Sequence, residues 1–310
     1  MGLVSNATAK KPIILKAVTA WPGHQTTLVK FNEWIKQFNE LAKGEVQINY
    51  IGGPEAIPYN EQAGALQRGV IDIACTAAAY HMGMIPEAEA IGISRLNYKE
   101  ERERGFIDLL SQVYEKHDLK YLGRFQLGAP LGMICTNVLI KKPSELKGLK
   151  IRSVMIYDAF LKELGVIPVT VPWTEIYTSM ERGLVDAFVG SMSGGFTSQG
   201  FHEVCKYVIN HPFYNTPTLA LMSLKTWNKL PEEYQDLLIQ SVIDIEPEVD
   251  RFFRNSHEVE LQKAKEAGVQ IIEFSPEDAK WFLDTAYRVS WDNLLKKAPE
   301  YGPKLKEIAY

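Results

Sequence analysis

Residues 147–190 constrain the fold most, because strands and helices alternate there in the order that builds a parallel sheet. Residues 149–151 form a run that is too short for anything but a buried strand. This strand places Arg152 at its carboxyl end, the edge at which open α/β sheets bind ligands. A planar guanidinium at that edge can hold a carboxylate through two parallel hydrogen bonds. The spacing alone leaves open a surface ion pair instead, for which the candidate partners are Asp158, Glu163 and Glu175.

Several short motifs follow one another along nearly the whole chain. They are GGPEAIP at 52–58, QRGVID at 67–72, GLKIR at 148–152, PVTVP at 168–172, EIYT at 175–178, ERGLVD at 181–186 and TWNKLP at 226–231. Each motif is weak alone, but their order and spacing are specific. Together they resemble the solute-binding subunits of TRAP transporters, the DctP-like family of extracytoplasmic receptors.

The resemblance implies an α/β fold of the periplasmic-binding-protein type, class II. Two α/β lobes would close on a small organic acid in a cleft between them, and a long helix would span both. We expect residues 11–129 and 217–254 in lobe I, residues 130–216 and 255–310 in lobe II, and residues 1–10 as a tail. The resemblance also implies a periplasmic protein without a cofactor, which delivers its ligand to the TRAP membrane permease subunits.

The same resemblance suggests the residues of the cleft. An arginine that matches Arg152 grips the ligand carboxylate in the family, and Trp173 stands where an aromatic ring commonly packs on the ligand. Relatives often carry polar or charged side chains, among them a second arginine and an asparagine, where this chain has Ala77, Tyr80, Gly132 and Gly190.

Other candidates lie in predicted loops, at strand ends or, for Tyr177, on the helix after Trp173. They are Trp21, His24, Tyr177, Phe188, Ser191 and Tyr214, and backbone groups, Ser191 or Ser193 could replace the missing asparagine. Each has an alternative reading: the aromatic rings as core packing, His24 as a solvated turn residue, and the small residues around Ala77 as an ordinary helix start.

The number of cations in the expected cleft limits the class of ligand that can bind there. Only Arg152 is retained, so a second buried carboxylate would lack a partner and cost several kcal/mol in desolvation. Sugar acids are disfavoured, since their hydroxyls would meet too few hydrogen-bonding groups. We therefore expect a monocarboxylate with an apolar or aromatic body.

Charge, cysteine usage and hydropathy exclude several classes of protein. The net charge of −4 comes without a basic run, so nucleic acid is not an expected partner. No apolar stretch reaches about 18 residues, so we expect no membrane span. The first ten residues lack a secretory signal, and the family reading implies that it has been removed. The three cysteines are widely separated, which argues against a zinc site and for buried thiols, although one disulfide pair stays open.

Catalysis and ligand sensing are the alternative functions to transport. The sequence shows no nucleophile elbow, phosphate-binding glycine loop or zinc spacing, and Asp186 with Glu175 is the one acid and base pair to consider. Glu175 could equally orient Arg152 or favour a helix start. A stand-alone sensor that presents its closed form to a receptor would use the same fold.

Apolar periodicity predicts the remaining elements. We expect strands at 13–19, 46–51, 71–75, 119–126, 133–140, 204–209 and 269–272, with lobe crossings at 127–130 and 218–223. Helices are expected at 28–42, 60–68 and 99–116, from 231 onward with a kink at Pro247, and at 279–297 as the last helix.

Overall fold

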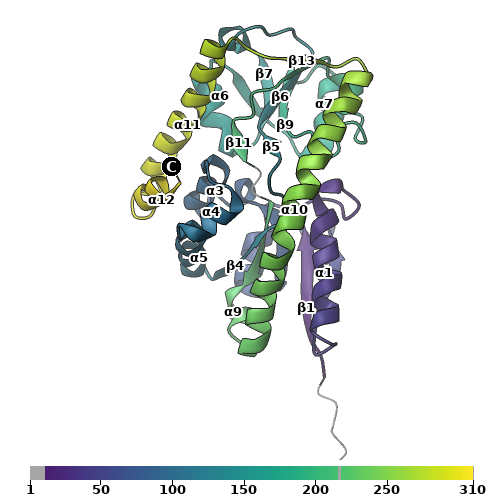
Figure 1. Cartoon of the computed structure of the whole chain (residues 1–310), viewed down its shortest axis with the longest axis vertical. Coiled ribbons are helices and arrows are strands. Elements are labelled where there is room, and N and C mark those ends of the chain that lie inside the picture. The colour runs from purple at the N-terminus through teal and green to yellow at the C-terminus, as the bar shows by residue number, and fades with distance from the viewer. Residues whose placement is uncertain (1–10, 216–217, 310) are drawn as a thin grey trace, which may run out of the picture.

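The computed structural model describes residues 11–215 and 218–309 and contains two large β-sheets, one in the lower and one in the upper half of Figure 1. The first sheet has the strand order β2-β1-β3-β12-β4. Its strands are β1 (Ile13–Thr19), β2 (Val46–Gly52), β3 (Ile73–Ala77), β4 (Leu119–Arg124) and β12 (Thr218–Ser223). Strand β1 is parallel to β2 and β3, whereas β12 is antiparallel to β3 and β4.

The second sheet has the order β13-β10-β6-β9-β7-β8. Its strands are β6 (Met133–Thr136), β7 (Lys150–Ser153), β8 (Ile167–Thr170), β9 (Ala187–Gly190), β10 (Tyr207–Ile209) and β13 (Gln270–Ile272). Strand β7 is parallel to both β8 and β9, so the carboxyl ends of these three strands meet at one edge. Strand β5 (Pro130–Leu131) pairs with β11 (Tyr214–Asn215) between the two sheets, where the chain crosses from one half to the other.

Helices cover both sheets. They are α1 (Val29–Leu41), α2 (Gln62–Arg68), α3 (Ala90–Ile93), α4 (Tyr98–Glu103), α5 (Phe106–Lys116), α6 (Asp158–Glu163), α7 (Ile176–Glu181), α8 (Phe201–Val204), α9 (Leu224–Trp227), α10 (Glu232–Glu266), α11 (Pro276–Lys297) and α12 (Gly302–Ile308). Short 3-10 turns include η2 (Ala78–Tyr80), η3 (Pro86–Glu89), η5 (Met155–Tyr157) and η6 (Trp173–Glu175).

Helix α10 joins the two halves along one side of the molecule (Figure 1). It contacts α1 and β4 of the first half, and its Ala264 lies in the apolar cluster of the second. Glu260 of α10 accepts hydrogen bonds from the backbone N–H and hydroxyl of Thr197. Pro247 lies inside the helix, which continues past it because proline removes only one local hydrogen bond. The expected two-lobed α/β fold with a long helix is confirmed.

The lobe boundaries remain a prediction. Helix α11 contacts α6 in the second half and α3 in the first, and α12 contacts α5 and α3, so the C-terminal helices touch both halves. The expected tail and the boundary at 216 and 217 lie outside the described residues.

Several predicted elements differ from the structure. The single helix expected at 99–116 is two, because Gly105 adopts a left-handed φ of 77° between α4 and α5. The strand expected at 204–209 begins only at Tyr207, since α8 extends to Val204. The strand expected at 133–140 ends at Thr136, and α12 follows the helix that we expected to be last.

Candidate ligand-binding site

Arg152 lies buried at the carboxyl end of β7, with 3% of its surface exposed. Its Nε donates a hydrogen bond of 2.9 Å to the backbone oxygen of Val171, and its guanidinium lies over the Trp173 ring at 5.6 Å from the centroid. The Val171 bond fixes the plane of the guanidinium and leaves both Nη groups for other acceptors.

Within the described part of the chain, no carboxylate pairs with Arg152. Asp158 instead accepts a hydrogen bond from Ser153, and Glu163 pairs with Arg288, so neither serves as the surface partner that the spacing had left open. Glu175 is the N-cap residue of α7 and makes no side-chain capping bond there. Burial lowers the pKa of Arg152, and Tyr80 and other nearby phenols oppose this effect only in part. A buried cation without an anionic partner is costly, so this position is a candidate site for an anion.

An inner cavity of about 680 Å³ lies between the two halves and is lined by Arg152. Of the residues expected in the site, the cavity brings together Trp21, Ala77, Tyr80, Arg152, Trp173, Gly190, Ser191 and Tyr214. A larger outer cleft of about 1190 Å³ shares Arg152, Trp173 and Tyr80 with it.

Aromatic rings line the cavity near Arg152. Tyr80 packs on Tyr59 at 4.5 Å between ring centroids and on Trp21 at 5.8 Å. Burial raises the pKa of Tyr80 to about 12, so its hydroxyl keeps its proton and can donate to an anion. The Trp173 indole N–H donates to Gln199 at 2.7 Å, which turns the polar edge of this ring away from a ligand and offers its carbon surface.

Four expected residues do not line the cavity. His24 is exposed, and the Tyr177 hydroxyl donates to Glu203 on the surface. Phe188 is fully buried against Phe196 and Phe201. Gly132 lies next to the cavity residue Leu131 but outside the lining itself.

The two glycines at positions where relatives are polar have steric explanations. Gly132 has a φ of 74°, and a Cβ there would lie 3.0 Å from the Cβ of Tyr214, so an arginine would be strained. A Cβ at Gly190 would lie 2.7 Å from the Phe188 ring. In this chain, Phe188 therefore occupies the space beside residue 190.

Sequence reasoning missed several residues that line the cavity. They are Thr27, Ala79, Gln126, Leu131, Val154, Ile156, Tyr157, Val189, Gly194 and Thr218. The segment of residues 154–157 directly follows the strand that carries Arg152, and this position could have identified it. Gln126 and Thr218 flank the two crossings between the halves, and no sequence motif singles them out.

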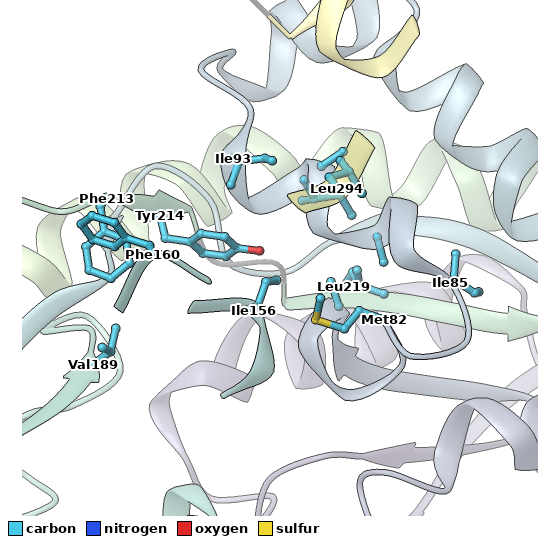
Figure 2. Packing of buried hydrophobic residues seen from close by; sticks show 14 of the residues in the cluster. Met82, Ile85, Ile93, Ile156, Phe160, Val189, Phe213, Tyr214, Leu219 and Leu294 are labelled. Carbon is cyan, nitrogen blue, oxygen red and sulfur yellow. The ribbon is translucent and has the colours of Figure 1, made fainter. Parts of the chain in front are cut away.

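Tyr214 lines the cavity and also packs in the apolar core. Its ring meets Tyr157 edge to face at 5.0 Å, and its hydroxyl donates to the backbone oxygen of Glu89 at 3.4 Å. Figure 2 shows Tyr214 in this core with its hydroxyl directed away from Phe213 and Phe160. The ring therefore presents carbon to the cavity.

Gly92 of α3 makes room for that ring. A Cβ at this position would lie 1.7 Å from Cζ of Tyr214. We expect Gly92→Ala to lower the free energy of unfolding by about 1–3 kcal/mol, because the ring must leave its place. Urea denaturation measures this change. In a Tyr214→Leu background the same alanine should cost much less, and an equal cost in both backgrounds would refute the assigned contact.

The described residues contain no group of three or more His, Cys, Asp or Glu side chains that could hold a metal ion. The three cysteines are free and buried. Nor does any helix in residues 11–215 and 218–309 combine the length and hydropathy needed to cross a bilayer.

Comparison with known proteins identifies the family. Residues 17–297 match the DctP family, described as bacterial extracellular solute-binding protein, family 7. The chain belongs to this family. The resemblance seen in the sequence is thus confirmed: this is a periplasmic solute-binding protein of the TRAP type and not an enzyme.

Individual relatives are similar over most of their length. A monocarboxylate 2-oxoacid-binding periplasmic protein of Nostoc sp. is 24% identical over 288 residues, covering 89% of this chain and 77% of the relative. A TRAP solute-binding protein from Desulfovibrio salexigens with bound orotic acid superposes with a TM-score of 0.85 at 20% identity, covering 96% of this chain and 97% of the other. A Bordetella pertussis receptor binding pyroglutamic acid superposes with a TM-score of 0.84 at 16% identity, covering 96% and 99%. These structures support the fold.

Proposed function

We propose that this DctP-family protein captures a monocarboxylate with an apolar or aromatic body and delivers it to the membrane permease subunits of a TRAP transporter. The observation that carries the proposal is the buried Arg152 guanidinium, which lines a cavity and pairs with no carboxylate in the described residues. The carboxylate of the ligand would supply the missing charge through the Nη groups.

The surroundings of Arg152 favour one carboxylate and no second. Arg152 is the only Lys or Arg among the residues that line the inner cavity, as far as the described residues go. The rest of the wall is mostly carbon, from aliphatic side chains and from the faces of Trp173 and Tyr214. A second ligand carboxylate would be desolvated without a cation, whereas an apolar body gains by leaving water.

The named relatives are consistent with this ligand class. The Nostoc protein is described as binding monocarboxylate 2-oxoacids, and the two superposed structures hold orotic acid and pyroglutamic acid, each with one carboxyl group. Delivery follows from the family: ligand contacts that exist only when the halves close would favour the closed form, which docks on the permease.

A calorimetric titration tests the proposal. Aromatic monocarboxylates, aliphatic 2-oxo acids and dicarboxylates should be compared at one ionic strength and pH. We expect at least one monocarboxylate to bind and to raise the Tm by mass action, because it binds only the folded protein. Tight binding of a dicarboxylate without binding of any monocarboxylate would refute the proposed ligand class.

A further inference from the structure

The inner cavity has two distinct ends. Arg152 lines both this cavity and the outer cleft, so it stands where the two meet. Gln126 lines the inner cavity and also a separate polar cavity of about 750 Å³ beside the crossing strands, whose lining includes Gly128 and Arg254. The outer cleft does not include Gln126, and the polar cavity does not include Arg152. Arg152 therefore lies where the inner cavity meets the outer cleft, and Gln126 lies where it meets the polar cavity.

The amide of Gln126 is buried, with 4% of the residue exposed, and only part of its hydrogen-bonding capacity is used. Its Nε2 donates to Ser193 Oγ at 3.1 Å, and its Oε1 accepts from Thr218 Oγ1 at 3.1 Å. A primary amide offers two N–H groups and two lone pairs. One N–H and one lone pair of Gln126 are therefore left for a further partner.

Hydroxyl groups extend the polar end of the cavity. Ser191 and Ser193 are joined through their Oγ atoms at 2.8 Å, so a hydrogen-bonded row runs from Thr218 through Gln126 to Ser191. All of these groups are neutral. This end of the cavity can hydrogen-bond a neutral group, but it cannot compensate a charge.

Much of the remaining lining of the inner cavity is apolar. It includes Ala77, Leu131, Val154, Ile156 and Val189. Trp173 and Tyr214 add ring faces there, since their own N–H and O–H groups are bonded elsewhere.

We propose that the ligand carries, besides its carboxylate, one neutral hydrogen-bonding group at its far end, a hydroxyl or a carbonyl, and that Gln126 receives it. This inference rests on the proposed function and refines its ligand class from an apolar monocarboxylate to one with two polar ends. The carboxylate lies at Arg152, the carbon body between the apolar walls, and the neutral group at the free positions of the amide. A ligand without that group loses affinity, because the polar positions that it covers stay unpaired.

Two pairs of ligands with equal numbers of non-hydrogen atoms isolate this contact. The pairs are 4-hydroxybenzoate with 4-methylbenzoate, and 5-hydroxypentanoate with hexanoate. In the wild-type protein, we expect the hydroxyl ligand to bind about tenfold more tightly than its methyl counterpart in at least one pair. In Gln126→Met that ratio should fall to about one. The dissociation constants come from calorimetry of the full chain.

The ratio separates ligand contact from a structural role of Gln126. A side chain that only ties the two halves together would lower both affinities of a pair alike and leave the ratio unchanged, which would overturn the inference. Gln235→Met is the matched control, because this glutamine bonds only backbone oxygens of Trp227 and Leu230, far from the cavity, and the ratio should not move.

The outcomes also separate this inference from the proposed function. Methyl ligands that bind as tightly as hydroxyl ligands, and that depend on Arg152, overturn the inference and leave the monocarboxylate proposal standing. If no monocarboxylate of the wider titration panel binds, or if binding survives the loss of Arg152, the proposed function fails and this inference fails with it.

Discussion

Arg152→Met is expected to weaken binding of the monocarboxylate ligand by about 100-fold or more, because it leaves the carboxylate buried without a partner. Arg152→Lys keeps the charge but should still cost about tenfold or more. An ammonium cannot form the two parallel bonds of a guanidinium, and it cannot keep the Nε bond to Val171 in the same plane. Calorimetric titration of both variants measures the losses.

The stability of the same variants without ligand distinguishes a binding arginine from a structural one. If Arg152 serves to bind an anion, its burial without a partner destabilises the ligand-free protein. Arg152→Met should then raise the free energy of unfolding by about 1 kcal/mol or more. If Arg152 served the fold, the same change would lower it. Arg288→Lys is the control, since its exposed ion pair with Glu163 should affect neither binding nor stability appreciably.

The position of Arg152 could be predicted because the evidence for it is local. Strand β7 spans Lys150–Ser153, close to the strand predicted at 149–151, and a strand end is fixed once the strand is found. The helix break at Gly105 was also visible in the sequence, as was the start of α12, where Pro303 follows Gly302. Hydrophobic periodicity alone gives neither boundary, whereas these glycine and proline signals do.

The hydrogen-bonded row around Gln126 could not be predicted in the same way. Gln126, Thr218 and Ser193 are far apart along the chain, and only the folded structure brings them together. Phe188 was expected at the ligand because it lies on a strand that ends at the cleft. Its side chain points to the opposite face of the sheet from the cavity lining residue Val189, as alternate residues of a strand must.

The second large effect is on the pH dependence of stability, and it comes from a buried carboxyl group. Glu89 of η3 is fully buried in the interface with α11, and burial raises its pKa to about 7, with smaller opposing effects of Lys297 and Asn293. In the unfolded chain, the pKa is near its ordinary value of 4.5. Below that pH the carboxyl is neutral in both states and costs nothing in charge burial. As the pH rises from about 4.5 to 7, the folded protein loses about 3 kcal/mol of stability through this one group.

Glu89→Gln isolates that loss because glutamine stays neutral at every pH. The free energy of unfolding of the variant should be close to that of the wild type near pH 4.5 and about 3 kcal/mol higher near pH 8, as measured by urea denaturation across this range. The contributions of all other titrating groups to the free energy of unfolding cancel in the difference between the two proteins. Glu40→Gln, which removes an exposed carboxyl from α1, should show a difference near zero throughout. A difference for Glu89→Gln that does not change with pH, or that grows as the pH falls, would show that the buried carboxyl is ionised and well compensated in the folded protein.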